Sequence, residues 1–343
     1  MNLIEMVKAA GVVGAGGAGF PTHVKLNTNV EYFIVNAAEC EPLIETDKYL
    51  CRTFADRIIR TIPQIAEAIG ASKKVIALKG AYEKEIAALK VAIREQNSDV
   101  EIFELGYFYP AGDEQTLIQQ VTGRCVPERG LPSDVGCVVD NVGTVLNIAD
   151  ALEGKAVTEK YLSVVGEVEH PIQLRVPIGT PVLECVKAAH PTVSDFALIM
   201  GGPMMGKQLT EQAAMEQAVV TKTTGNILVL PKDHYLFRKA SLPMETVRKQ
   251  TKSACLQCKM CTELCPRYLI GHQIHPNLMM RGLWLEPTIT DNEEYLRMYG
   301  EAANCCSCGV CEMFACPMGL SPRKVNDYFK AEFRKRGIQV PKN

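Results

Sequence analysis

Nine of the fourteen cysteines lie between residues 255 and 316, where they form two closely related runs. The first run reads Cys-x2-Cys-x2-Cys-x3-Cys-Pro from Cys255, and the second reads Cys-x2-Cys-x2-Cys-x4-Cys-Pro from Cys305. This spacing is typical of proteins with two [4Fe–4S] clusters, in which the fourth cysteine of each run ligates the other cluster. The predicted ligands of one cluster are Cys255, Cys258, Cys261 and Cys316. Those of the second are Cys265, Cys305, Cys308 and Cys311.

Structural zinc is the alternative for a set of cysteines. Zinc sites usually pair two Cys-x2-Cys elements, which differs from the triple spacing found here. Cys306 is expected to be an unligated thiol, although an exchange of roles with Cys305 stays open. His272 and His275 are expected to be packing or surface residues, because the cysteine set is already complete. The five scattered cysteines are predicted to be buried small apolar side chains: Cys40, Cys51, Cys125, Cys137 and Cys185.

A second candidate site is the glycine-rich stretch GVVGAGGAGFPTHVKLN at residues 11–27. Gly14, Gly16 and Gly19 match a G-x-G-x-x-G frame, and Glu39 follows about twenty residues later, as in dinucleotide-binding motifs. Such a motif must follow a strand and open a helix. Here an amphipathic helical pattern capped by Asn2 comes before it, and Pro21 comes directly after it. We therefore reject a dinucleotide motif and predict a loop whose backbone approaches an anionic or planar ligand, a plain flexible turn being the alternative.

Composition limits the class of protein. The 343 residues carry a formal net charge of −2, with Lys and Arg scattered along the chain. This pattern argues against nucleic-acid binding and against a polybasic membrane anchor. No apolar run is long enough to span a bilayer, and the first residues lack the features of a signal peptide. We expect a cytoplasmic protein.

The elements that must position these residues fall into three predicted domains. In residues 1–155, the strand-like segments YFIVNA, KKVIALK and VEIFEL alternate with amphipathic helices, one of them with an expected kink at Pro63. Such alternation predicts a mainly parallel sheet covered by helices. Residues 160–235 predict a small α+β domain, and residues 245–335 predict a helical domain that carries the two cysteine runs.

Four segments of the first domain carry a family resemblance: GAGGAGFPTHVKLN, VNAAECEPLIETDKYL, YPAGDEQTLI and VVDNVGTVLNIADAL. They resemble the flavin-contacting segments of the FMN- and NADH-binding subunit family of respiratory complex I, and more closely the C subunit family of the Rnf electron-transport complex. Residues 160–235 resemble the β-grasp (SLBB) domain of these families. The cysteine-rich segments are similar to the cobalamin reductase family of propanediol-utilising microcompartments, whose members usually carry a further C-terminal domain. The implied fold class is α/β: a Rossmann-like FMN-binding domain, a β-grasp domain and an α-helical two-cluster ferredoxin-like domain.

The resemblance also implies a set of flavin-binding residues, with Phe20 where a nicotinamide would approach. They are Gly14, Gly16, Gly17, Phe20, Lys25, Asn36, Glu39, Tyr109, Gly112, Asp113, Glu114, Asp140, Asn141 and Thr144. The family often has Asp where this chain has Ala38, and Asn where it has Asp140. For each residue the alternative is an ordinary structural role, such as a solvated carboxylate, a core aromatic or a helix cap.

The resemblance implies an NADH-dependent oxidoreductase that passes electrons from NADH through FMN and two [4Fe–4S] clusters to an acceptor. The expected acceptor is cobalamin or a redox protein such as a bound flavoenzyme, with a cobalamin adenosyltransferase as a candidate partner and a bacterial microcompartment as a candidate location. A flavin is needed because NADH gives an electron pair, whereas each cluster carries one electron. The chain needs no nucleophile or general acid for this chemistry. The alternative is a non-catalytic relay subunit, similar to the Rnf C subunit, that docks between other redox proteins of a larger complex.

Overall fold

The computed structural model describes residues 1–341 as two compact units. The first unit consists of residues 1–124 and 132–237, and the second of residues 125–131 and 238–341. The segment Cys125–Leu131 therefore belongs with the cysteine-rich part of the chain, although it lies within the sequence of the flavin domain.

The N-terminal part of the first unit is built on a parallel sheet in the order β3-β2-β1-β4. Its strands are β1 (Tyr32–Asn36), β2 (Lys73–Lys79), β3 (Glu101–Leu105) and β4 (Cys137–Asn141). Its helices are α1 (Leu3–Ala9), α2 (Thr22–Lys25), α3 (Thr46–Thr53), α4 (Ala55–Ala68), α5 (Glu83–Glu95), α6 (Glu114–Thr122) and α7 (Val142–Leu152). The three strands predicted from the segments YFIVNA, KKVIALK and VEIFEL are confirmed.

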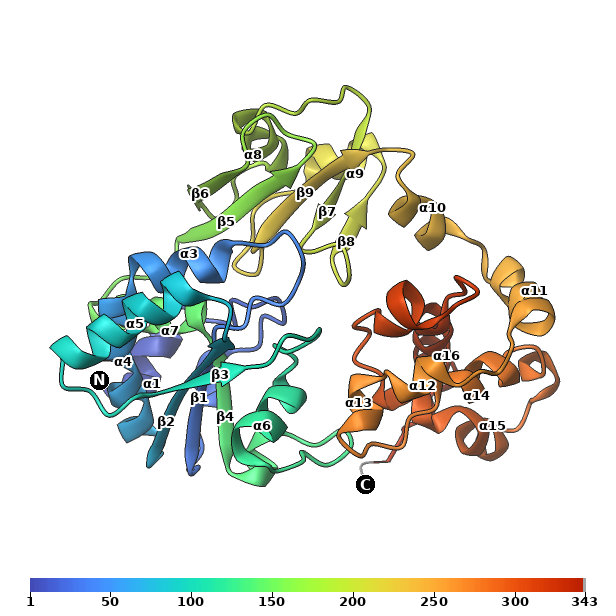
Figure 1. Cartoon of the computed structure of the whole chain (residues 1–343), viewed down its shortest axis with the longest axis horizontal. Coiled ribbons are helices and arrows are strands. Elements are labelled where there is room, and N and C mark those ends of the chain that lie inside the picture. The colour runs from blue at the N-terminus through green and yellow to red at the C-terminus, as the bar shows by residue number, and fades with distance from the viewer. Residues whose placement is uncertain (342–343) are drawn as a thin grey trace. The chain divides into compact units, whose positions relative to one another are not determined.

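Helices cover both faces of this sheet. Phe33, Val35 and Ile76 belong to a large apolar core that also includes side chains of α1, α4, α5 and α7. Helix α6 contacts β1 and β4 (Figure 1). The predicted cap of the first helix is confirmed, since the Asn2 side chain accepts a hydrogen bond from the backbone of Glu5. The long helical segment divides at Phe54, between α3 and α4, and Pro63 lies inside α4.

A five-stranded sheet with the order β6-β5-β9-β7-β8 completes the first unit. Its elements are β5 (Glu159–Gly166), β6 (Ile172–Pro177), α8 (Val182–Ala188), β7 (Phe196–Met200), β8 (Lys207–Leu209), α9 (Gln212–Gln217) and β9 (Asn226–Pro231). The central strands β5 and β9 are parallel and the outer pairs are antiparallel, which is the arrangement of a β-grasp fold. Its core is separate from that of the parallel sheet.

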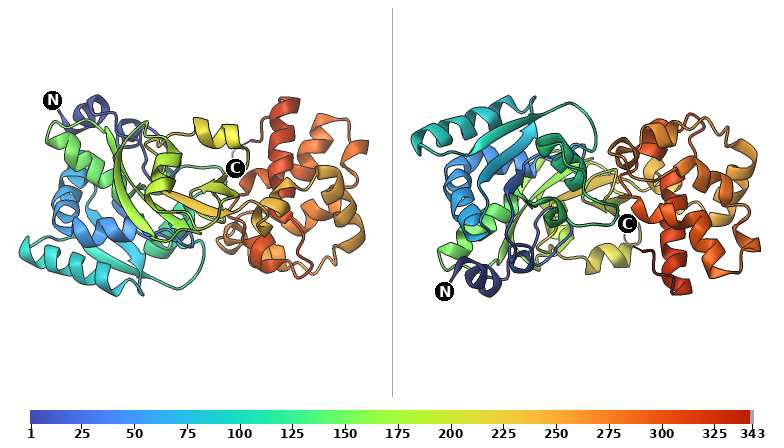
Figure 2. Two further views of the ribbon diagram at one scale, coloured as in Figure 1. Left: turned by 90° about the horizontal axis from the view of Figure 1, so that it is seen from above. Right: turned by 90° about the horizontal axis from the view of Figure 1, so that it is seen from below.

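The second unit is helical, and α16 is its longest described helix (red in Figure 2). Its α-helices are α10 (Tyr235–Ser241), which starts at the end of the first unit, α11 (Met244–Ala254), α12 (Met260–Glu263), α13 (Pro266–Leu269), α14 (Pro276–Gly282), α15 (Asn292–Tyr299) and α16 (Pro322–Arg336). Tyr295, Tyr299 and Phe329 are fully buried, and the rings of Tyr299 and Phe329 stack at 4.1 Å between centroids. This aromatic core holds α14, α15 and α16 together beside the cysteine runs.

The end of β5 gives a first test of the fold. Gly166 has a φ of +99°, and a Cβ on it would overlap the carbonyl oxygen of Val229 in β9. Gly179 has a similar φ of +95°, but no described atom lies within 4 Å of its Cβ position. Each Gly→Ala change costs about 1–2 kcal/mol of stability, because an alanine is strained in the left-handed backbone conformation. We expect Gly166→Ala to lower the thermal unfolding midpoint clearly more than Gly179→Ala. Equal effects of the two changes would contradict the β5–β9 packing.

Candidate flavin and iron–sulfur sites

The carboxyl ends of β1 and β4 lie side by side at the topological switch point of the sheet, where the strand order changes direction. From β1 the chain proceeds to β2 and β3 on one side and then returns to β4 on the other side, with Asn36 paired to Asn141. Ligands of open parallel sheets bind outside the strand ends at such a switch point. The segments after β1 and β4, the start of α6 and the glycine loop contribute residues around this point.

The glycine loop is folded as a tight return rather than as a helix start. Val13 and Pro21 form a β-bridge, and the Gly14 amide donates to the Phe20 carbonyl at 2.9 Å. The buried Thr144 Oγ1 accepts from the Ala15 amide at 2.9 Å, which ties the loop to α7. Gly17 has a φ of +118°, and apart from its own chain neighbours no atom of residues 1–341 lies within 4 Å of its Cβ position. The loop thus presents glycine backbone beside open space, as a planar or anionic ligand requires.

A second close approach joins the segment after β1 to the start of α6. Asn36 Nδ2 donates to the Gly112 carbonyl at 2.9 Å, and Asn36 Oδ1 accepts from the Ala38 amide at 3.1 Å. A Cβ on Gly112 would lie 2.6 Å from the Ala38 carbonyl oxygen, so only glycine fits there. Asn36 and Gly112 therefore shape the strand end through their contacts with each other.

Lys25 lies in a cluster of charged groups between β4 and α6. Its ammonium is 2.9 Å from Glu114 Oε1 and 3.7 Å from Asp140 Oδ1, and it also donates to the Val139 carbonyl. Burial alone would lower the pKa of Lys25, but Asp140 and Glu114 outweigh it and raise the pKa above its ordinary value. Burial raises the pKa of Asp140 to about 6, although Lys25 opposes this shift.

A buried oxygen atom of Asp140 matches the hydrogen-bonding groups of FMN. Its Oδ2 atom is buried and has no hydrogen-bond partner within residues 1–341. A buried acceptor of this kind calls for a donor, and the ribityl chain of FMN offers hydroxyl groups. Together with the open glycine loop, this acceptor makes the residues present compatible with FMN.

A second pair of carboxyl groups lies between β1 and α7. Asn141 Nδ2 donates to Asp47 Oδ2 at 2.7 Å, and the Asp47 amide donates to Glu39 Oε2 at 3.3 Å. Burial raises the pKa of Asp47 to about 6 and, with help from Asp47, raises that of Glu39 well above its usual value. Glu39 and Asn141 were predicted from the sequence, whereas Asp47 was not, although it lies in the segment VNAAECEPLIETDKYL.

Three further residues of the predicted flavin set, Tyr109, Asp113 and Phe20, differ in their surroundings. The Tyr109 hydroxyl lies 3.5 Å from Glu41 Oε1, and Glu41 in turn accepts from the Met204 amide of the β-grasp fold at 3.0 Å. Asp113 caps α6 through its Oδ1 atom, which is the structural alternative considered from the sequence. Phe20 is 52% exposed at the rim of the glycine loop.

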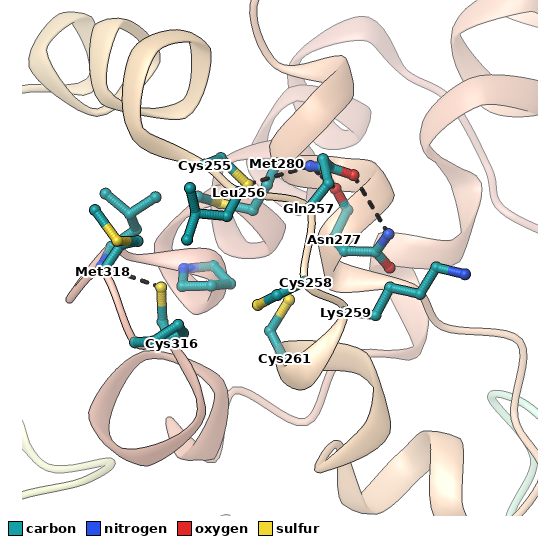
Figure 3. Close-up of a pocket in the computed structure, with 13 residues that line it drawn as sticks. Cys255, Leu256, Gln257, Cys258, Lys259, Cys261, Asn277, Met280, Cys316 and Met318 are labelled. Atoms are coloured by element: carbon teal, nitrogen blue, oxygen red, sulfur yellow. Dashed lines mark hydrogen bonds between the residues drawn. The ribbon is translucent and has the colours of Figure 1, made fainter.

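The first cysteine set converges on one pocket of the second unit. Cys255, Cys258, Cys261 and Cys316 line it together with apolar side chains such as Leu256 (Figure 3). Burial, with the neighbouring thiols Cys255 and Cys316, raises the pKa of Cys261 to about 12. Thiols crowded in this way ligate as thiolates only where a positively charged centre compensates them, which fits a cluster. Within residues 1–341 no group of three His, Cys, Asp or Glu side chains is placed to hold a single metal ion.

The two cysteine runs repeat the same backbone conformation. Gln257 and Ser307, each two residues after the first cysteine, have φ angles of 53° and 58°. Lys259 and Gly309, two residues further on, have φ angles of 66° and 85°. The residue at the first of these positions also donates to the first cysteine: Gln257 Nε2 to Cys255 Sγ at 3.1 Å, and the Ser307 amide to Cys305 Sγ at 3.3 Å. This repeat aligns Cys305 with Cys255 and places Cys306 at the position of Leu256.

The second cysteine set also draws on both runs. Cys265 lies beside Cys305 and Cys306, and Cys311 lies beside Cys305 and Cys265. Burial raises the pKa of Cys265 to about 11 and that of Cys311 well above its ordinary value. Cys265 of the first run therefore lies with thiols of the second run, and Cys306 is one of them, since it also shares a hydrogen bond with Cys308. Which of these thiols ligate a cluster stays a prediction.

A buried lysine that was not predicted from the sequence supports the segment from Cys311 to Gly319. Lys239 Nζ donates to the carbonyls of Glu312 at 2.9 Å and Gly319 at 3.2 Å. No local sequence pattern signals this contact, since about seventy residues separate the partners.

The histidines between the runs are engaged in hydrogen bonds. His272 is buried with Nε2 at 2.9 Å from the Val126 carbonyl, and His275 Nδ1 lies 2.8 Å from Glu301 Oε2. Both agree with the packing role expected for them. Among the scattered cysteines, Cys51, Cys137 and Cys185 are buried as predicted. The prediction was wrong for Cys125, which is exposed, and Cys40 is half-buried.

Two known protein families match the parts of the chain that carry the candidate sites. The family model of the Nuo51 FMN-binding domain matches residues 7–150, and that of a 4Fe-4S dicluster domain matches residues 254–321. Fold and site thus define a flavin and iron–sulfur oxidoreductase of the electron-transfer type. FMN and two [4Fe–4S] clusters are its cofactors.

Similar proteins narrow this class. The chain is 45% identical over 332 residues to "Cobalamin reductase PduS" of Citrobacter freundii, which covers 96% of this chain and 71% of the relative. The chain belongs to the family of this cobalamin reductase. It is also 33% identical to the C subunit of the Na(+)-translocating ferredoxin:NAD(+) oxidoreductase complex of Acetobacterium woodii, over 82% of this chain and 61% of that relative.

A solved structure shares the fold. A chain of an NAD+-reducing [NiFe]-hydrogenase in the H2-reduced state superposes with a TM-score of 0.64 at 20% identity. The match covers 98% of this chain and 62% of the hydrogenase chain. Within residues 1–341 no helix is long and apolar enough to cross a bilayer.

Gly17 tests the position of the flavin. We expect Gly17→Ala to retain roughly one-tenth or less of the FMN, because its methyl group enters the open space and the left-handed backbone is strained. Gly123→Ala is the matched control, since Gly123 has a φ of +73° and also lacks described neighbours within 4 Å of its Cβ position. FMN released by heat is measured per chain. Full retention of FMN in Gly17→Ala would show that the glycine loop is not part of the FMN site.

The cysteine assignment is tested by metal content. Anaerobically purified protein should hold about eight iron and eight sulfide per chain, as two [4Fe–4S] clusters require. Cys258→Ala should lose about half of both, because one ligand set is broken. Cys306→Ala is the control and should keep all of them. Loss of iron in Cys306→Ala but not in Cys305→Ala would show that the two neighbouring cysteines exchange roles.

Proposed function

We propose that this chain is an NADH-dependent oxidoreductase that reduces a cobalamin, with FMN and two [4Fe–4S] clusters as its internal carriers. The observation that carries the proposal is that one chain combines a flavin fold with two cysteine sets and is 45% identical to a cobalamin reductase over nearly its whole length. When bound, FMN takes an electron pair as hydride and releases electrons one at a time, and each cluster carries a single electron.

The chain's own residues bind and orient these groups. The glycine loop offers backbone at Gly16 and Gly17, and Asp140 Oδ2 offers a buried acceptor to a ribityl hydroxyl. The eight cysteines named above would hold the clusters, with the Gln257 side chain and the Ser307 amide donating to two of the sulfurs. Donors to cluster sulfurs stabilise the reduced state and so tune its potential. Phe20, exposed at the loop rim, is the proposed contact for the nicotinamide ring.

A non-catalytic relay is the second candidate. The 33% identity to a C subunit of an ion-translocating ferredoxin:NAD+ oxidoreductase complex favours it, because that relative is one part of a larger assembly. In that case the β-grasp domain docks a neighbouring redox protein. An adenosyltransferase partner and a place in the cytoplasm, inside a bacterial microcompartment, are further proposals that rest on family resemblance.

The deciding experiment is anaerobic turnover with NADH as sole donor and hydroxocobalamin as acceptor, followed by the visible spectrum of the corrinoid. The reaction is run with and without a cobalamin adenosyltransferase, because trapping of cob(I)alamin would draw forward a difficult last reduction. Cys258→Ala is the internal comparison. We expect it to reduce an artificial dye from the flavin while its cobalamin reduction falls at least about tenfold, since one electron carrier is missing.

The outcomes separate the candidates. Reduction of cobalamin by the purified chain supports the reductase. Reduction of dyes but of no corrinoid, even with the adenosyltransferase present, supports the relay. If protein that holds FMN and iron fails with dyes as well, NADH is not its donor.

A further inference from the structure

Lys160 is a buried lysine that contacts the glycine loop from outside the FMN-binding domain. It stands near the start of β5 in the β-grasp fold, beyond residues 7–150, which the FMN-binding family model matches. Its side chain is buried, and its ammonium donates to the carbonyl of Ala15 at 3.1 Å. A lysine is rarely buried unless it is paired, so its position calls for an explanation.

The contact fixes Ala15 from both sides. The Ala15 amide donates to Thr144 of α7, and its carbonyl accepts from Lys160 of β5. The peptide units before and after Ala15 are thereby held in one orientation, immediately ahead of Gly16 and Gly17. Because a buried hydrogen bond to a charged group is stronger than one between neutral groups, Lys160 is the firmer of the two ties.

A turn of the β-grasp fold supports the same loop at its two ends. Lys222 donates to the Gly11 carbonyl, and a Cβ on Gly19 would lie 3.1 Å from Thr223 Cγ2. The β-grasp fold therefore contacts the glycine loop at its beginning, middle and end.

Two acidic residues near the strand ends, Asp47 and Glu39, affect the charge of Lys160. Burial lowers its pKa to about 8, while the carboxylates of Asp47 and Glu39 act in the opposite direction. Asp47, in the first turn of α3, accepts from Asn141 at the end of β4, and its amide donates to Glu39, so both acids lie next to the strand ends at which we propose the flavin. The charge of Lys160 is thus influenced by two partly buried carboxyl groups, while its hydrogen bond goes to the Ala15 carbonyl.

We propose that Lys160 is a positioning residue of the flavin site, which holds the Ala15 peptide and supplies the positive charge that balances Asp47 and Glu39. The β-grasp domain is then a part of the flavin site and not only a docking domain. This inference rests on the proposed position of FMN at the glycine loop. Affinity for FMN depends on the hydrogen bond to Ala15, and the flavin potential depends on the charge, since a nearby cation favours the reduced, more anionic flavin.

The experiment measures FMN affinity and flavin midpoint potential in full-length anaerobic protein. Lys160→Met should weaken FMN binding by about tenfold or more, the loss expected for a hydrogen bond to a charged group, and should make the potential more negative. In the Lys160→Met, Asp47→Asn double variant the potential should return toward that of the parent while FMN binding stays weak. Lys155→Met is the matched control, because Lys155 is an exposed lysine paired with Glu153.

Two comparisons keep the proposal open to refutation. If Lys160→Met does not fold, Lys160→Gln takes its place, because glutamine keeps a hydrogen-bond donor and loses the charge. We then expect a clear negative shift of the flavin potential and only a small loss of FMN affinity. Parental affinity and potential in the folded Lys160 variant would overturn the proposal. If Lys160→Met keeps FMN while Gly17→Ala loses it, the flavin site stands and only the role of Lys160 is refuted.

Discussion

The pairing of β1 with β4 is the constraint on which the flavin site depends. The register sets Asn36 opposite Asn141, so the turns that follow the two strands leave the sheet side by side. The Asn141 side chain then reaches Asp47 on α3, and Thr144, one helical turn further along α7, reaches the glycine loop. A shift of the register would separate these contacts at once, because each turn is tied to the end of its strand.

The cysteine-rich unit depends on a different constraint, a repeated loop conformation that carries left-handed residues. Lys259 and Gly309 occupy equivalent positions, yet only one of them is glycine. A lysine with a φ of 66° is strained by about 1 kcal/mol or more, which the surrounding loop must offset. Because the same conformation recurs in both runs, it is a property of the ligand loop and not of one local sequence.

The sequence predicted the elements and motifs whose signals are local. The strand segments, the Asn2 cap and both cysteine runs could be identified because they depend on neighbours within a few residues. The contacts of Lys160 and Lys239 could not be predicted, since their partners lie 145 and about seventy residues away. The family resemblance identified the segment that contains Asp47, yet drew attention to Glu39 in its place. The exposed Cys125 shows that residue type alone does not predict the burial of a single side chain. Cysteines are buried on average, but the exposure of each one depends on its place in the fold.

The membership of residues 125–131 in the cysteine-rich unit has a consequence for how this protein can be divided. Glu128 accepts from the Gln273 amide and from Asn304, while the Val126 carbonyl lies against His272. A fragment that starts after the β-grasp domain would lack these partners and would leave buried polar groups of the cluster unit unsatisfied. The cysteine-rich unit is therefore discontinuous in sequence and is not an independent segment of the chain. A recombination event that exchanged the C-terminal third would also have to exchange residues 125–131, which lie within the sequence of the flavin domain.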